Sequence, residues 1–312
     1  MSESIMTSTE RQSSAKTVWP LRQYIWSVKR EIWGNKFLFF GPLAIVLLPV
    51  ILICSSLIRS RVFGGAGPAP DVFFRVTAEL LASIANLAGL TVGCVYALGT
   101  FYNERKDLSI LFWKSLPVSD RLSVVAKASI VLLVTPFFTL VLTYMAVWAL
   151  AVATMQAYGI SLETLTGHIG LGRLFEDYAA YALLNALWWL PIYAILFVIS
   201  AVVRSVPIVW ILGAWAALSI TEIVGFHTNY ITNTVWDRFL NFPGTGLHDA
   251  KMQITARRLD GFNVEHSSVD KLAAGQAHLA ALFTSPALWW GVVIGLLCLA
   301  LTVWLRRRAE PI

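Results

Sequence analysis

The sequence predicts an all-α protein that crosses a membrane several times. Hydrophobic residues make up 57% of the chain and charged residues only 13%, and the mean hydropathy is +0.67. About a quarter of the residues in a soluble globular domain are charged, so this composition excludes that class. The apolar residues also gather in runs of about 20, the length that a helix needs to cross the hydrocarbon core of a bilayer.

Six apolar stretches meet this length requirement. They lie near 37–58, 79–101, 126–153, 178–202, 206–225 and 286–305. Pro42, Pro49, Pro136 and Pro191 fall inside these stretches, where neighbouring helices can support the kinks that proline causes. No cleavable signal peptide is expected, because the first apolar run is long enough to span the membrane.

Two segments precede the first span. Residues 1–16 are polar and rich in serine, and we expect them to be mobile. Residues 17–36 have a helical period, with Arg22, Lys29 and Arg30 on the polar side. The apolar face gathers five residues, which are Leu21, Tyr24, Ile25, Val28 and Ile32. This pattern is typical of a helix that lies in the membrane interface; a soluble helix packed on the cytoplasmic loops is the alternative.

The basic residues predict the orientation of the chain. They form three groups, which are Arg11, Lys16, Arg22, Lys29, Arg30 and Lys36 before the first span, Arg105, Lys106, Lys114, Arg121 and Lys127 after the second, and Arg306, Arg307 and Arg308 after the last. Six spans place all three groups on one side, which the positive-inside rule makes cytoplasmic. Both termini, including the tail 306–312, are therefore expected inside, and the segment 227–285 outside. Arg59 and Arg61 are exceptions to the rule.

The loop after the second span contains the most informative pattern. Residues 103–117 predict a short amphipathic helix, which ends where Pro117 cannot continue it. One face gathers Leu108, Leu111, Phe112 and Leu116. Ile110 and Trp113 fall on the opposite face, among Lys106, Asp107 and Lys114, and we expect another surface to cover them. Such a helix is suited to pass a partner's motion into the bilayer; an interfacial helix with its tryptophan among the headgroups is the alternative.

A set of short motifs in this loop suggests a family. Glu104-Arg105 is followed by Leu111-Phe112 and by Ser115-Leu116-Pro117-Val118-Ser119, and Lys127 opens the next span. The pattern resembles that of permease subunits of type 2 ABC exporters, and the number of spans and the position of the loop extend the resemblance over most of the chain. The resemblance implies that 103–117 is a coupling helix in a groove of a separate ATPase subunit. It also implies that 17–36 is the elbow helix before the first span.

The resemblance further implies roles for single residues and for partners. Ile110, Trp113, Leu116 and Pro117 would dock on the ATPase or shape the helix, whereas Glu104, Arg105 and Asp107 would make polar contacts or set its orientation. Two ATPase subunits would bind ATP and Mg, so no cofactor is expected in this chain. A second permease chain, identical or related, and membrane lipid would surround it in the plasma membrane, the inner membrane of a bacterium.

The second span also contains a stripe of small residues. Ala85, Gly89, Gly93 and Ala97 are four residues apart, so they share one face of a helix, along which the backbone of another helix can approach closely. The neighbour can belong to this chain or to a second copy, and we favour this chain.

Several motifs of catalysis and ion coupling are absent from the sequence. Ion-coupled transporters place ionisable groups inside their spans, but here Glu222 is the best candidate, and we favour an interfacial position near the outer surface for it. No G-x-x-x-x-G-K-[ST] phosphate loop or H-E-x-x-H motif occurs, and the five histidines lie in predicted loops. The net charge of +6 follows from membrane orientation, so no nucleic acid partner is expected.

These absences favour a transport subunit driven by a separate ATPase and not an enzyme. Two alternatives remain open. One is a membrane-embedded enzyme that acts on a lipid or quinone through 227–285, and the other is an anchor or sensor that transports nothing.

Overall fold

The computed structural model describes residues 20–63, 70–108, 119–163, 171–230, 232–233 and 283–308. These residues form helices and no strand. Six of the helical segments are long and apolar enough to cross a membrane. The predicted all-α fold with six spans is therefore confirmed for a multi-pass membrane protein.

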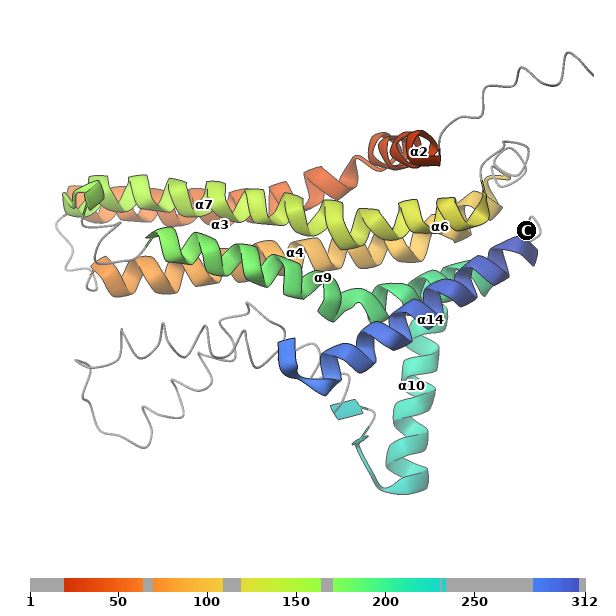
Figure 1. Cartoon of the computed structure of the whole chain (residues 1–312). Helices are drawn as coiled ribbons and strands as arrows, with labels where there is room; N and C mark the ends of the chain where they lie inside the picture. The colour runs from red at the N-terminus through yellow and green to blue at the C-terminus, as the bar shows by residue number, and fades with distance from the viewer. Residues whose placement is uncertain are drawn as a thin grey trace, which may run out of the picture.

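The described helices follow the order of the chain. Their bounds are α2 (Pro20–Gly34), α3 (Phe37–Phe63), α4 (Pro70–Lys106), α6 (Asp120–Ser129), α7 (Thr135–Tyr158), α9 (Leu171–Val202), α10 (Pro207–Phe226) and α14 (Pro286–Arg308). A π-helical turn, η1 (Ile130–Val134), joins α6 to α7, so the three form one continuous span. In Figure 1, α3, α4, α7 and α9 run beside one another, α14 lies against α9, and α10 extends away from the others.

Proline explains the π-helical turn. Pro136 has no N–H, and in an α-helix its ring collides with the carbonyl four residues earlier. The chain widens in the turn before it, and both the backbone N–H and the side-chain Oγ1 of Thr135 donate to the carbonyl of Ile130. Insertions of this kind are frequent at functional sites.

The core consists of two groups of buried apolar side chains. One lies mainly between α4 and α9 and contains Tyr96, Phe101, Trp188 and Phe197. The other lies between α3, α4 and α7 and contains Val46, Phe74, Leu81 and Leu150. α10 adds little to either group, since only Pro207 and Glu222 of its residues are buried.

The stripe of small residues on α4 packs within this chain. Ala85 and Ala97 are fully buried. Gly89 faces the side chain of Thr139 on α7, and Gly93 faces the ring of Tyr193 on α9. The stripe therefore brings both α7 and α9 close to the α4 backbone, and its two glycines do not face a second copy.

The predicted helix 103–117 does not begin where the sequence pattern placed it. Glu104, Arg105 and Lys106 complete α4, and Leu108 has φ 56°, which is not helical. A leucine in this left-handed conformation interrupts a right-handed helix. The remaining residues of the predicted helix, 109–117, lie outside the described residues, and so do the segment 1–16 and most of 227–285.

The amphipathic helix α2 turns only part of its predicted apolar face to the bundle, where Val28 and Ile32 pack against the core. Ser27 and Glu31 are buried, whereas Leu21 is 66% exposed and Ile25 53%. Tyr24 still points inward, where its hydroxyl donates to Ser129 Oγ at 2.7 Å. The polar partners of Glu31 and Tyr24 hold this face against the bundle together with that packing, and Leu21 and Ile25 remain on the outer surface of the helix.

Candidate functional site

Charged side chains from four helices meet at one end of the bundle. This is the end where α4 ends and α6 begins, and we call it the loop end. The residues are Glu31 of α2, Glu104 of α4, Asp120 and Lys127 of α6, and Arg306 of α14, which we call the charge cluster. All but Asp120 are buried. The cluster therefore joins segments far apart in the sequence.

Lys127 occupies the centre of the charge cluster and is only 2% exposed. Its Nζ donates to Glu31 Oε1 at 3.0 Å and to Thr100 Oγ1 at 2.9 Å, and it lies 3.0 Å from Glu104 Oε1. An ammonium group has three protons to donate. All three have acceptors here, which stabilises a charge that burial alone would disfavour.

Arg306 forms the second half of the charge cluster. Its Nη1 donates to Glu104 Oε2 at 2.6 Å and its Nε to Asp120 Oδ1 at 3.1 Å. Glu104 thus uses one carboxylate oxygen for Lys127 and the other for Arg306. The ring of Phe101 lies beside both cations, with its centroid 5.5 Å from Lys127 Nζ and 5.3 Å from Arg306 Cζ, at distances typical of cation–π contacts.

The charges of this site balance. Arg30 donates to Glu31 Oε1 at 2.6 Å, and with it the three carboxylates of the cluster face three cations. Tyr96 donates its hydroxyl proton to the other oxygen of Glu31 at 2.9 Å. Removing one partner from such a buried set leaves an unpaired charge, which costs far more than an exposed ion pair contributes.

Arg105 joins α4 to α9 beside the cluster. Its Nη2 donates to the carbonyls of Ser200 at 2.7 Å and Val203 at 2.6 Å. These carbonyls lie at the end of α9, where helical hydrogen bonds run out and a cation is favourable. In return, Ser200 Oγ accepts from the backbone N–H groups of Phe101 and Tyr102, both at 3.1 Å. The end of α9 is thereby held to α4.

The structure places only some of the seven residues predicted for the ATPase contact. Glu104 and Arg105 point into the bundle and are 9% and 5% exposed. Of the two roles predicted for them, these positions fit the setting of orientation and not direct contact with a partner. Asp107 is exposed. Ile110, Trp113, Leu116 and Pro117 lie outside the described residues.

Three members of the charge cluster were not selected from the sequence. Glu31 follows Tyr24 by seven residues and Val28 by three, so it lies on the side of α2 assigned as apolar; an acidic residue there is a signal for a buried partner. Asp120 is the first residue of α6, directly after the N-cap residue Ser119, and its sequence context does not indicate a partner. Arg306 was assigned to the basic end of the last span, and nothing local identifies its partners.

Glu31 makes the stability of the site depend on pH. Burial raises the pKa of its carboxyl, but the nearby Lys127 and Arg30 outweigh burial and lower this pKa from 4.5 to about 2. Because the folded pKa is the lower one, the stabilisation is complete above about pH 4.5 and is lost as the pH falls toward 2.

We expect acid to destabilise the detergent-solubilised protein by on the order of 3 kcal/mol through this group. The measurement is the unfolding temperature between pH 6 and pH 2.5 for the unaltered chain and for Glu31→Gln. The variant should lose part of the acid dependence, whereas Asp107→Asn, at an exposed carboxyl, should keep it. Equal acid dependence in all three proteins would contradict the role of Glu31.

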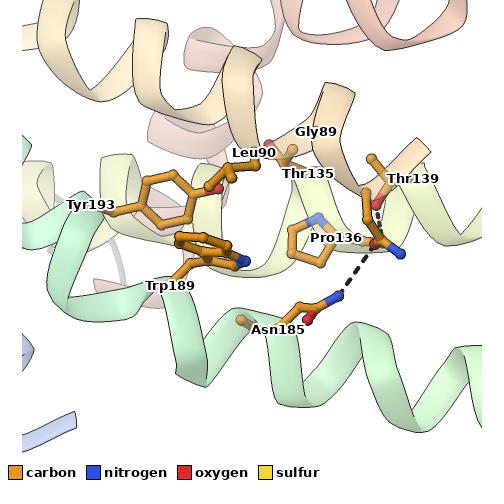
Figure 2. Close-up of a pocket in the computed structure, with 10 residues that line it drawn as sticks. Gly89, Leu90, Thr135, Pro136, Thr139, Asn185, Trp189 and Tyr193 are labelled. Atoms are coloured by element: carbon orange, nitrogen blue, oxygen red, sulfur yellow. Dashed lines mark hydrogen bonds between the residues drawn. The ribbon is translucent and has the colours of Figure 1, made fainter. Parts of the chain in front are cut away.

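A second polar site lies in the middle of the bundle, between α4, α7 and α9. It is a cavity of about 20 Å³, bordered by Thr135 and Pro136 at the π-helical turn (Figure 2). Asn185 donates from Nδ2 to Asn86 Oδ1 at 3.3 Å, whereas its own Oδ1 has no hydrogen-bond partner among the described residues. The cavity has the size of one water molecule. Polar side chains, which include Asn86, Thr139 and Asn185, contribute to its lining, but no charged side chain does.

Glu222, the best candidate for a buried functional carboxylate in the sequence, lies near the end of α10. It is buried, and its Oε2 accepts from the backbone N–H of Thr232 at 3.1 Å and from Thr232 Oγ1 at 3.3 Å. These bonds hold the segment after α10 against that helix, which is a structural role.

The described residues hold no group of three or more histidine, cysteine or acidic side chains that could bind a metal ion. Comparison with known proteins adds no relative: no protein-family model, no curated protein and no solved structure matches the chain.

Proposed function

We propose that this chain is the permease subunit of an ATP-driven exporter in the plasma membrane. In this proposal a separate ATPase subunit binds the loop between α4 and α6, which contains Ile110 and Trp113. Two permease chains and two ATPase subunits form the transporter, and ATP and Mg bind only to the ATPase. The motif resemblance of the loop is the first support.

One observation in the structure carries the proposal further. Arg306 of α14 binds Glu104, near the last residue of α4, and also Asp120, the first residue of α6. Both ends of the loop are therefore held by one guanidinium group. Arg306 and Glu104 are both buried, so breaking the bond between them would leave buried charges less well paired, and the connection is therefore stiff.

The connection extends from the loop to other parts of the bundle. Lys127 joins Glu104 to Glu31 of α2, and Arg105 joins the end of α4 to the end of α9. A displacement of the loop by a bound partner would thus be transmitted to five helices, which are α2, α4, α6, α9 and α14. This is the property that a subunit without its own ATP site needs in order to use an external motor.

The test is affinity purification of the tagged chain from its native membrane, followed by mass identification of associated chains and an ATPase assay. We expect an ATP-hydrolysing subunit in stoichiometric amount. Trp113→Ala should leave the fold intact and uncouple ATP hydrolysis from transport, and charged residues at both Ile110 and Trp113 should release the ATPase. Trp290→Ala, at an exposed tryptophan near the start of α14, is the matched control.

Two results would contradict the proposal. One is a chain that purifies alone without ATPase activity. The other is full coupled transport in the Trp113→Ala variant.

A further inference from the structure

A long apolar groove runs along the surface of the bundle between α6, η1, α9 and α14. Its volume is about 810 Å³. Most of its lining is aliphatic, including Val125, Leu132, Leu187, Leu190, Leu299 and Val303. All of these residues belong to candidate membrane spans, so a groove at this place borders the acyl chains of the bilayer.

Side chains along the groove are accessible from outside the bundle. Leu133 of η1, Leu183 of α9 and Leu296 of α14 all line the groove, and each is exposed by more than half. Large apolar side chains exposed to water would be unfavourable, but within a membrane the same surface binds a hydrocarbon chain.

The groove has cations at one end only. Arg121 and Arg307 line it together with Trp304. Each arginine is the chain neighbour of a member of the Asp120–Arg306 ion pair, whose atoms are 3.1 Å apart, so both lie at the loop end. Both are exposed, and in the part of the chain that the structure describes neither has an ion-pair partner.

The length of the groove fits one leaflet. Twelve residues separate Arg121 from Leu133 along the groove, which corresponds to about 18 Å of helix. Half of a hydrocarbon core of about 30 Å is about 15 Å. An acyl chain that begins near Arg121 and Arg307 therefore reaches roughly the bilayer midplane at the other end of the groove.

We propose that the groove is a binding site for one anionic phospholipid of the leaflet at the loop end. An acyl chain lies between α6, α9 and α14, and the phosphate accepts hydrogen bonds from Arg121 and Arg307. Guanidinium groups suit this role because they bind phosphate oxygens in pairs and stay charged. A second protein helix would fill the apolar part but would need carboxylates of its own to pair with both arginines, whereas an anionic phospholipid supplies the chain and the charge together. The site does not depend on the proposed transport function.

The charge of the headgroup is tested by native mass spectrometry of the detergent-purified chain, incubated with equal amounts of phosphatidylglycerol and phosphatidylcholine. We expect one bound lipid with a strong preference for phosphatidylglycerol. The double variant Arg121→Gln/Arg307→Gln should lower that preference by roughly tenfold or more. The double variant Arg59→Gln/Arg204→Gln removes two exposed charges outside the groove and should keep it.

The acyl chain is tested by filling the groove without changing its charge. Ala300 lines the groove, and Ala300→Phe should remove the bound lipid of either headgroup. Ala214→Phe adds the same ring to an exposed position of α10 and should not. The proposal is overturned if the unaltered chain shows no headgroup preference, if the two phenylalanine variants bind lipid equally, or if Ala300→Phe dissociates a dimer that carries no lipid.

Discussion

Replacement of Lys127 by methionine should destabilise the folded chain by about 3–5 kcal/mol, the usual cost of removing one partner from a buried ion pair. Methionine has a similar length, so the change removes the charge with little change in packing. Glu31 and Glu104 would each lose the partner 3.0 Å away, while Tyr96 and Arg306 cannot move into the vacated position without breaking their own bonds.

The measurement is the thermal unfolding of the purified variant in detergent. Unfolding is monitored as the loss of the monodisperse peak in size-exclusion chromatography. Lys36→Met is the matched control, because Lys36 is exposed and should contribute less than about 1 kcal/mol. Equal unfolding temperatures for the two variants would show that the ion pairs of the charge cluster do not stabilise the fold.

A second substitution tests whether the loss comes from the stranded carboxylate. If it does, Glu31→Gln added to Lys127→Met should recover part of the stability, since a neutral amide has a smaller desolvation cost than a carboxylate. We expect a coupling of about 1 kcal/mol or more between the two positions. If the stability losses of Lys127→Met and Glu31→Gln were simply additive in the double variant, that result would contradict a direct interaction between the two residues.

Replacement of Gly93 by leucine should be strongly destabilising, with a cost of about 3 kcal/mol or more. A Cβ atom at this position would lie 2.8 Å from the Tyr193 hydroxyl oxygen and 2.9 Å from its Cε1. Tyr193 is buried and cannot swing into open space. Leucine would therefore force α9 away from α4, at the level of the cavity that Tyr193 borders.

The comparison for this prediction is Gly213→Leu on α10. Nothing lies within 4 Å of a Cβ atom at Gly213, and leucine is the better helix former by nearly 1 kcal/mol, so that variant should be neutral or more stable. The stability of the Gly93→Leu and Gly213→Leu variants is measured by the unfolding temperature and by the yield of monodisperse protein. A Gly93→Leu variant as stable as Gly213→Leu would show that α4 and α9 do not pack as described.

Only part of the candidate site could be predicted from the sequence. The Glu104-Arg105 motif and Lys127 marked the place, because they border the loop between two spans. The contacts of these residues could not be predicted, because the sequence around a charged residue beside a span is the same whether its side chain faces lipid headgroups or another helix. Asp120 and Arg306 are 186 residues apart and Lys127 and Glu31 are 96 apart, and no local pattern relates residues at such distances.

The class of the protein and the number of its spans were determined by the sequence alone. Hydropathy is a property of each segment, and a helix in lipid must satisfy its own backbone hydrogen bonds whatever its neighbours are. The stripe of small residues is likewise a pattern within a single segment, so it could be predicted from the sequence. The tertiary structure alone decided that α2 turns Glu31 inward and that Arg306 binds both ends of the loop between α4 and α6. It also decided that Arg121 and Arg307 lie at the same end of one groove. These features depend on which helices lie side by side, and that choice is made by packing and by the pairing of buried charges across the whole chain.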